Sequence, residues 1–259
     1  MTGDRFGLCG YVVPMRTAPR WSIGWSTVRL IAALLILAAI VAQAMRSIGG
    51  AISRNGDVAT TGVNFFSFFT VLSNAGSVVV LSIVGMWGLR HWREGRPLPF
   101  GPATALACVT TYMIVTGVVY NTLLRGIELP QGTTVPWSNE VLHVIGPIFL
   151  LLDVLFGSSP ARLPWRAVLG ILVFPLLWVA YTLIRGPRVT NPTTGAAWWY
   201  PYPFLDPHVV SGYTGVVPYV LGIAAALAAF GAGVVYVGRR RTSGAALEAG
   251  SISQADPAR

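Results

Sequence analysis

Apolar residues dominate six long runs of the chain, and polar residues interrupt these runs only at intervals. The runs cover residues 26–45, 64–87, 102–124, 139–156, 165–184 and 213–238. Each approaches or exceeds the roughly 20 mainly apolar residues of a bilayer-spanning helix, whereas a membrane β-strand needs only about 9–11 residues of alternating polarity. The pattern therefore predicts an all-α, polytopic membrane protein with six transmembrane helices in one bundle.

The composition agrees with this interpretation. Of the 259 residues, 54% are hydrophobic and only 10% are charged, and the mean hydropathy is +0.63. Soluble domains carry about 25% charged residues. We divide the chain into an N-terminal arm (1–25), a transmembrane domain (26–238) and a C-terminal tail (239–259) that we expect to be disordered.

The basic residues predict the orientation of the bundle. All 18 are arginines, and 13 of them fall in the N-terminal segment up to and including Arg29, the second and fourth loops and the tail. Because cytoplasmic loops carry the excess of basic residues, both termini are predicted to be cytoplasmic. Clustering in alternate loops also argues against nucleic acid as the partner of a chain with net charge +9. A basic set without lysine suggests a GC-rich bacterial genome, and hence the bacterial inner membrane.

A cleaved signal peptide is the alternative for the N-terminus, since Arg16 and Arg20 precede an apolar run that ends in Ala42-Gln43-Ala44. That run is long for a signal core, and cleavage would leave five spans with the termini on opposite sides. We therefore favour six spans. The two cysteines, Cys9 and Cys108, imply neither a disulfide nor a metal site.

The second apolar run carries a polar stripe. Its members recur at steps of three and four residues, which places them on one side of an α-helix: Ser67, Thr70, Ser73, Asn74 and Ser77. Buried polar groups are costly in hydrocarbon, so this side is predicted to face the bundle interior. Helix packing explains the serines, whereas the Asn74 amide needs fixed partners and is a candidate for orienting a base or an oxyanion.

The third and fourth runs add further candidates. Tyr120 and Asn121 lie near the outer end of the third run, where both are expected to line a pocket. In the fourth run, Asn139 lies one turn before His143 and can bind one ring nitrogen, which fixes the tautomer. The second and fourth spans both start outside, so Thr70 and His143 are predicted at matching depth. A hydroxyl and an imidazole are the minimum parts of an acyl-transfer site.

Asp153 lies ten residues beyond His143, about 15 Å deeper in a helix, and so cannot orient that ring. A carboxyl group at this depth is expected to be protonated or paired. We favour a structural bond to a neighbouring helix, with a proton relay as the alternative.

The last outer loop, from 185 to 212, is rich in aromatic residues and proline and contains Trp199 and Tyr202. Such side chains suit the membrane interface, and the loop is predicted to form a lid or a lipid-facing wall over the outer end of the bundle. We assign Asp206 and His208 in this loop to the interface rather than to catalysis.

Three of these features together resemble the androgen-induced membrane protein family, six-helix proteins whose characterised members hydrolyse fatty acid esters of hydroxy fatty acids within the membrane. The resemblance covers roughly residues 64–207. Its motifs are Phe69-Thr70 in the second run, the set Asn139, His143, Pro147 and Asp153 in the fourth, and Tyr202-Pro203-Phe204-Leu205-Asp206 in the last loop.

In that family a threonine and a histidine carry catalysis, which implies Thr70 as the nucleophile and His143 as the general base here. The resemblance implies attack of Thr70 Oγ1 on an ester carbonyl in the outer leaflet, followed by hydrolysis of the threonyl ester. Asn74, Asn121 and backbone groups are candidates for the oxyanion hole. The all-arginine basic set and extra residues around Trp199 depart from the animal members, which leaves the identity of the ester open.

We therefore predict a threonine-dependent intramembrane lipid ester hydrolase with an outer-leaflet cavity lined by the second, third and fourth spans. Its expected partners are membrane lipids and a fatty-acyl ester substrate, and no metal or other cofactor is expected, because no such motif is visible. The alternative is a non-catalytic membrane protein whose polar stripe serves packing, or whose cavity binds or carries a small lipid or solute.

Overall fold

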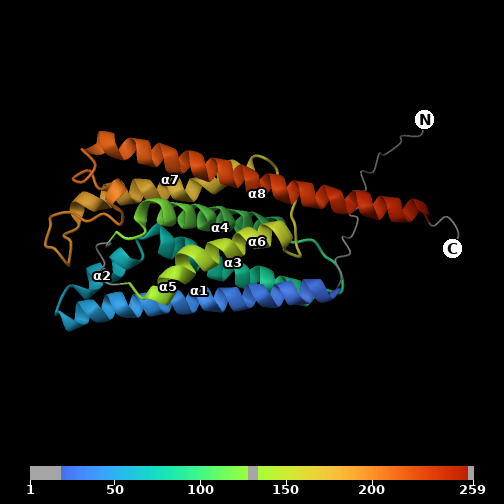
Figure 1. Ribbon diagram of the computed structural model, residues 1–259, viewed down its shortest axis with the longest axis horizontal. Helices are drawn as coiled ribbons and strands as arrows, with labels where there is room; N and C mark the ends of the chain where they lie inside the picture. The colour runs from blue at the N-terminus through green and yellow to red at the C-terminus, as the bar shows by residue number, and fades with distance from the viewer. Residues whose placement is uncertain (1–18, 128–133, 256–259) are drawn as a thin grey trace, which may run out of the picture.

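The computed structural model describes residues 19–127 and 134–255, which fold into a bundle of helices (Figure 1). Six helical spans are long and apolar enough to cross a membrane: Arg20–Ser53, Phe69–His91, Phe100–Leu124, Pro136–Phe156, Ala167–Arg188 and Tyr213–Ser243. The described residues contain no strand. The predicted all-α polytopic bundle is thereby confirmed.

Several helices extend beyond the apolar runs. The first span is α1 (Pro19–Ser53), and the last is α8 (Tyr213–Ala255). α8 therefore continues past 238, and the segment from 239 that we expected to be disordered is helical as far as Ala255. Most of the N-terminal arm, with Cys9, lies outside the described residues.

The second apolar run is broken, contrary to the continuous helix that we expected. α2 (Val58–Phe65) ends before a turn at 66–68, and α3 (Phe69–His91) begins directly after it. Asp57 caps α2 by accepting a hydrogen bond from Thr60 N, whereas no side chain caps the start of α3. Thr70 consequently lies in the first turn of α3, where backbone N–H groups lack partners within the helix and the helix dipole is positive.

The third and fourth spans are each built from more than one helical segment. α4 (Phe100–Val119) continues as the π-helical segment η1 (Tyr120–Leu124). The fourth span consists of α5 (Pro136–Glu140), the π-helical segment η2 (Val141–Ile145) and α6 (Gly146–Phe156). α7 (Ala167–Arg185) and the short 3-10 turn η3 (Gly186–Arg188) form the fifth span, and a second such turn, η4 (Pro203–Leu205), lies in the last loop.

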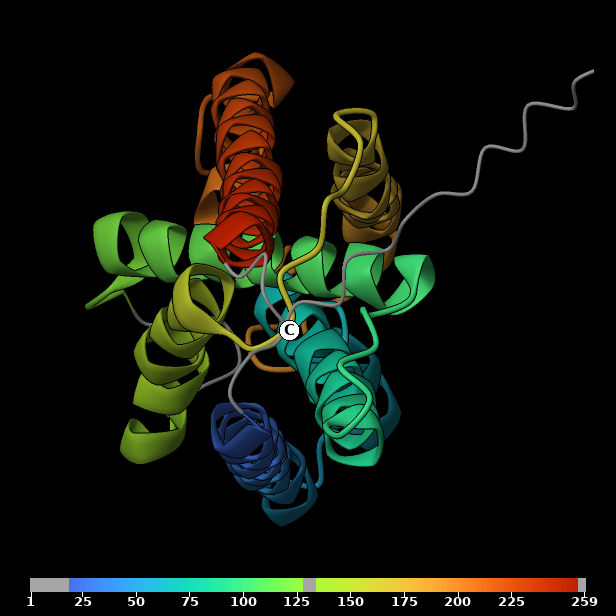
Figure 2. The ribbon, with the colours of Figure 1, turned by 90° about the vertical axis from the view of Figure 1, so that its right-hand side faces the viewer.

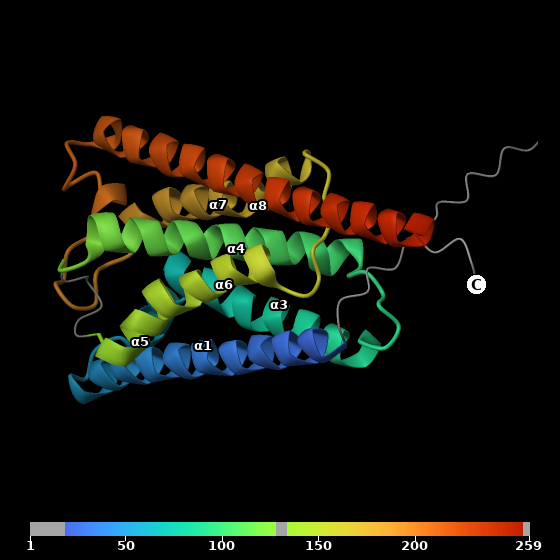
Figure 3. The same ribbon diagram turned by 45° about the vertical axis from the view of Figure 1, so that its right-hand side comes forward.

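α4 is the central helix of the bundle. Viewed along the bundle, it runs across the middle, with α1, α3 and α6 on one side and α7 and α8 on the other (Figure 2). The fourth span lies between α1 and α4 (Figure 3). Large apolar side chains such as Leu34, Leu169 and Leu221 are exposed on the outer helices, as expected for a surface in contact with lipid.

The polar stripe of the second run is buried, as predicted: Ser67, Thr70, Ser73, Asn74 and Ser77 are all at most 8% exposed. α3 and the fourth span both begin at the end of the bundle opposite to the start of α1 and the end of α8 (Figure 1). Thr70 and His143 therefore lie toward the same end of the bundle.

Candidate active site

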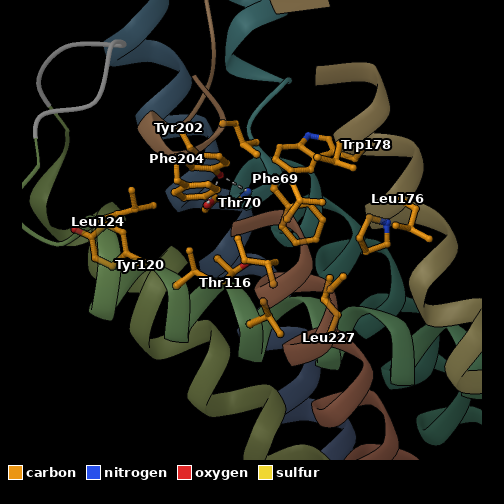
Figure 4. A pocket seen from close by; sticks show the side chains of 18 of the residues that line it. Phe69, Thr70, Thr116, Tyr120, Leu124, Leu176, Trp178, Tyr202, Phe204 and Leu227 are labelled. Atoms are coloured by element: carbon orange, nitrogen blue, oxygen red, sulfur yellow. Dashed lines mark hydrogen bonds between the residues drawn. The ribbon is translucent and has the colours of Figure 1, made fainter. Parts of the chain in front are cut away.

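Thr70 is held by Tyr202 of the last loop. Tyr202 Oη accepts a hydrogen bond from Thr70 N at 3.2 Å, and it lies 3.2 Å from Thr70 Oγ1 (Figure 4). Phe204 stacks on the Tyr202 ring, with 5.2 Å between ring centroids. Burial raises the pKa of Tyr202 above its ordinary value, so the phenol keeps its proton and remains a donor toward Thr70.

His143 lies in η2 and is oriented by its own helix. Its Nδ1 is 2.9 Å from the backbone carbonyl oxygen of Asn139. A carbonyl only accepts, so Nδ1 carries the hydrogen, and Nε2 of the neutral ring keeps a free lone pair. Tyr120 stacks on the imidazole at 3.8 Å between ring centroids. The ring is thereby fixed in the tautomer that a general base requires.

The role of Asn139 differs in detail from the predicted one. Its backbone carbonyl, and not its side chain, holds the His143 ring. The Asn139 amide instead donates to Tyr120 Oη. Asn139 and Tyr120 therefore support the imidazole together.

Thr70 and His143 line the same cavity, together with Tyr202 and Leu124; its empty space is about 520 Å³ with the opening included. Among the described contacts, no hydrogen bond joins the two side chains, since the Thr70 hydroxyl is directed to Tyr202. The cavity is enclosed by α1, the α2–α3 turn, η1 and the fourth span. The structure thus brings the predicted pair into one cavity without a described hydrogen bond between the two side chains.

Both π-helical segments occur at this site. In η2, the N–H of Gly146 donates to the carbonyl of Val141, five residues earlier, so the Leu142 carbonyl loses the donor that an α-helix would give it. The next amide belongs to Pro147, which has no N–H. The carbonyls of Leu142 and His143 consequently lack the donors, four residues on, that a regular α-helix would give them.

Asn74 and Asn121 satisfy these two carbonyls from neighbouring helices. Asn74 Nδ2 donates to Leu142 O at 3.2 Å and to Thr70 O at 2.9 Å. Asn121 Nδ2 donates to His143 O at 3.2 Å and to Gly117 O at 2.7 Å. Both hydrogens of each amide are therefore engaged, and neither asparagine is free to donate to an oxyanion as we expected. They position the fourth span against α3 and η1.

The Asn74 bond and the missing donor of Pro147 predict a coupled effect on stability. Asn74→Ala is expected to lower the free energy of unfolding by about 1–3 kcal/mol, because buried carbonyls lose their donor. Pro147→Ala restores an amide N–H in the fourth span. In that background, the loss of unfolding free energy caused by Asn74→Ala should therefore be smaller by about 0.5 kcal/mol or more. Unfolding titrations with dodecyl sulfate in mixed micelles measure all four variants. Strict additivity of the two substitutions would contradict the assignment of Asn74 as a donor to the fourth span.

A mainly apolar cavity lies on the other side of Thr70, and its empty space amounts to about 730 Å³ with the open mouth included. α7 and α8 supply nearly half of the lining residues, with Leu176, Val179, Ile223 and Leu227 among them. Thr70, Thr116, Tyr120 and Tyr202 are its polar members (Figure 4). Its walls come from the second, third, fifth and sixth spans and the last loop, whereas the predicted lining by the second, third and fourth spans is found in the cavity that Thr70 shares with His143. The apolar pattern could not show this, because it does not specify which helices are neighbours.

Trp199 lies apart from the two cavities at Thr70. It packs edge-on against Phe68 at 5.5 Å between ring centroids, under the Arg185 guanidinium at 5.5 Å. Its side chain is buried, so it anchors the last loop to the α2–α3 turn rather than forming a lipid-facing wall. In the same loop, His208 stacks on Trp198 and contacts Asp206, away from the cavities.

Asp153 is paired, as expected for a carboxyl group at this depth. Arg29 of α1 donates to it through Nε at 2.9 Å and Nη2 at 3.3 Å, and Trp25 Nε1 donates to the same carboxylate. We counted Arg29 among the arginines of the N-terminal segment, but it is a buried residue of the first span. Sequence reasoning missed this partner, since only packing brings α1 and α6 together.

Comparison of the chain with protein-family models, with curated proteins and with solved structures found no match.

Proposed function

We propose that the protein hydrolyses fatty-acyl esters within the membrane, with Thr70 as the nucleophile and His143 as the general base. The observation that carries the proposal is the position of Thr70 between two cavities. One is lined mainly by apolar side chains, which suits an acyl chain, and the other contains an imidazole whose Nε2 is free to take a proton. The resemblance of the Thr70, His143 and Tyr202 motifs to those of the androgen-induced membrane proteins supports the same chemistry.

The reaction proceeds in two steps. Thr70 Oγ1 attacks the ester carbonyl carbon while His143 Nε2 takes the hydroxyl proton, and the tetrahedral intermediate expels the alcohol, which receives that proton. Water then attacks the threonyl ester with His143 again as the base, which releases the fatty acid and restores Thr70. The first step requires the Thr70 side chain to turn from Tyr202 toward His143.

We assign the stabilisation of the oxyanion to the Tyr202 phenol. Its hydroxyl lies 3.2 Å from Thr70 Oγ1, so its O–H becomes available to the carbonyl oxygen when the Thr70 side chain turns toward His143, whereas the Thr70 N–H already donates to Tyr202 Oη. Donors fixed before the reaction stabilise the charge that develops on the carbonyl oxygen. This role replaces the one we expected for Asn74 and Asn121.

Labelling with a fluorophosphonate probe tests the nucleophile. The purified protein is expected to be labelled, Thr70→Ala to lose labelling, and Thr70→Ser to retain it, because serine keeps the attacking hydroxyl. Ser77→Ala is the matched control, since it removes a buried hydroxyl from the same stripe of α3, where Ser77 only contacts the Ser73 carbonyl. Equal labelling of the wild type and Thr70→Ala would exclude Thr70 as the nucleophile.

A non-catalytic lipid-binding protein is the second candidate. The observation that favours it is the contact of the Thr70 hydroxyl with Tyr202 in place of His143. In that case an acyl chain binds in the apolar cavity without turnover. Retention of a fatty-acyl ester by the purified protein, without release of fatty acid, would support this candidate over the hydrolase.

We also propose that the protein resides in a bacterial inner membrane with both termini in the cytoplasm. The arginine bias among the loops supports this orientation. A reporter that is active only in the cytoplasm is expected to be active when fused after Arg259. Activity of an export-dependent reporter at the same position would reverse the orientation and place Thr70 in the inner leaflet.

A further inference from the structure

A further cavity, lined by charged and apolar side chains, lies at the end of the bundle opposite to Thr70. It encloses about 460 Å³, its opening included, between α1, α4, α6, α8 and the link from α6 to α7. Arg29, Asp153 and Arg241 are the charged residues of its lining. The proposed hydrolase reaction uses none of these side chains.

The charges around this cavity do not balance. Asp153 is engaged by Arg29 in a two-pronged ion pair, and both side chains are 1% exposed. Arg241 adds a second guanidinium, which contacts only the backbone carbonyls of Val154 at 3.0 Å and Gly157 at 2.6 Å. No carboxylate of the described residues forms an ion pair with Arg241. The site therefore carries one uncompensated positive charge.

A buried donor in the same site also lacks a partner. Arg29 Nη1 is buried and makes no hydrogen bond with any described residue. An unsatisfied buried donor on a charged group is costly, and an anion that supplies an oxygen would remove this cost. Two guanidinium groups on different helices then act on one ligand.

The rest of the lining is largely apolar. Leu98, Leu106, Leu163 and Val234 form walls beside the arginines. A small hydrated anion gains nothing from such walls, whereas a ligand with an acyl chain buries apolar surface against them. The arginine-rich end of the bundle is also the end at which a lipid headgroup would lie.

We propose that this cavity binds an anionic amphiphile, whose phosphate or carboxylate group lies between Arg29 and Arg241 and whose apolar part packs on the adjoining walls. Anionic phospholipids and free fatty acids share this chemistry. A zwitterionic lipid brings its own cation to the site and binds more weakly. The site is separate from Thr70, so its occupancy does not depend on the proposed ester hydrolysis.

Native mass spectrometry of the full chain tests the proposal. The protein is released from nanodiscs that contain equal amounts of phosphatidylglycerol and phosphatidylcholine, and, in a second arm, from phosphatidylcholine nanodiscs loaded with palmitate. We expect the anionic species to be retained about tenfold more than phosphatidylcholine, through charge-assisted hydrogen bonds. Retention of phosphatidylglycerol identifies a phosphate headgroup, and retention of palmitate identifies a carboxylate.

Arg241→Gln is expected to abolish this preference, whereas the matched control Arg240→Gln is expected to keep it. Arg240 precedes Arg241 in α8, is exposed and lies over the Tyr236 ring at 5.2 Å, outside the cavity lining. Ala103→Leu, which fills the apolar wall without changing any charge, is expected to abolish retention as well.

Three results would overturn the proposal. The first is retention of neither anionic species by the wild type. The second is an equal loss in Arg240→Gln and Arg241→Gln, which would indicate general surface charge. The third is thermal stabilisation by inorganic phosphate alone, which would indicate a site for a small anion.

Discussion

Replacement of His143 by alanine is expected to lower the rate of ester hydrolysis by about 10²–10⁴-fold, the usual contribution of a general base. The Asn139 carbonyl holds the Nδ1 hydrogen, so Nε2 is the ring nitrogen that can take the Thr70 proton. Without the imidazole, the hydroxyl must lose its proton to water inside an apolar cavity. Release of fatty acid from a reconstituted ester substrate measures the change, with kcat as the affected constant.

Two further variants separate proton transfer from packing. His143→Phe keeps a ring that stacks on Tyr120 but removes the nitrogen, so it should lose as much activity as His143→Ala while retaining more stability. His91→Ala is the matched control, because His91 lies at the far end of α3 and stacks on Trp87. If His143→Phe hydrolysed the ester at the wild-type rate, His143 would have only a packing role.

Replacement of Asp153 by alanine is expected to lower the free energy of unfolding by about 3–5 kcal/mol. The side chains of Arg29 and Asp153 are both 1% exposed, so loss of the carboxylate leaves a buried guanidinium without its counter-ion. Trp25 Nε1 loses its acceptor in the same substitution. Unfolding titrations with dodecyl sulfate in mixed micelles measure the loss.

The cost should arise from the unpaired charge and not from loss of the pair itself. Joint replacement by Arg29→Met and Asp153→Leu is therefore expected to be less destabilising than Asp153→Ala alone. Glu94→Gln is the control for a solvent-exposed pair, since Glu94 contacts Arg96 at the surface, and it should cost no more than about 1 kcal/mol. A double variant less stable than Asp153→Ala would refute this explanation.

The number of spans could be predicted from the sequence because a helix in hydrocarbon must be long and apolar along its whole length. The ends of the helices were less well predicted. α1 and α8 continue as helices beyond their apolar parts, where polar residues do not interrupt the backbone hydrogen bonds. The break at 66–68 was missed, since phenylalanine and serine in that turn are as compatible with a helix as with its interruption.

The candidate site was predicted only in part. The polar stripe of α3 and the depth of His143 follow from periodicity and from the arginine bias, and the structure places Thr70 and His143 in one cavity. The structural roles of Asn74 and Asn121 could not be predicted from the sequence. The Asn74 amide was expected to need fixed partners and Asn121 to line a pocket, but each amide donates to a carbonyl of the fourth span, which only the contact of three helices brings within reach.

The sequence by itself determined that the chain forms six membrane helices and which face of α3 is buried, since both depend on the cost of polar groups in hydrocarbon. Only the tertiary structure decided which helices are neighbours. It placed α7 and α8 around the cavity at Thr70, Tyr202 on the Thr70 hydroxyl and Arg29 on Asp153. These contacts join residues more than 100 positions apart, and side-chain packing between helices, which the apolar pattern does not encode, determines them.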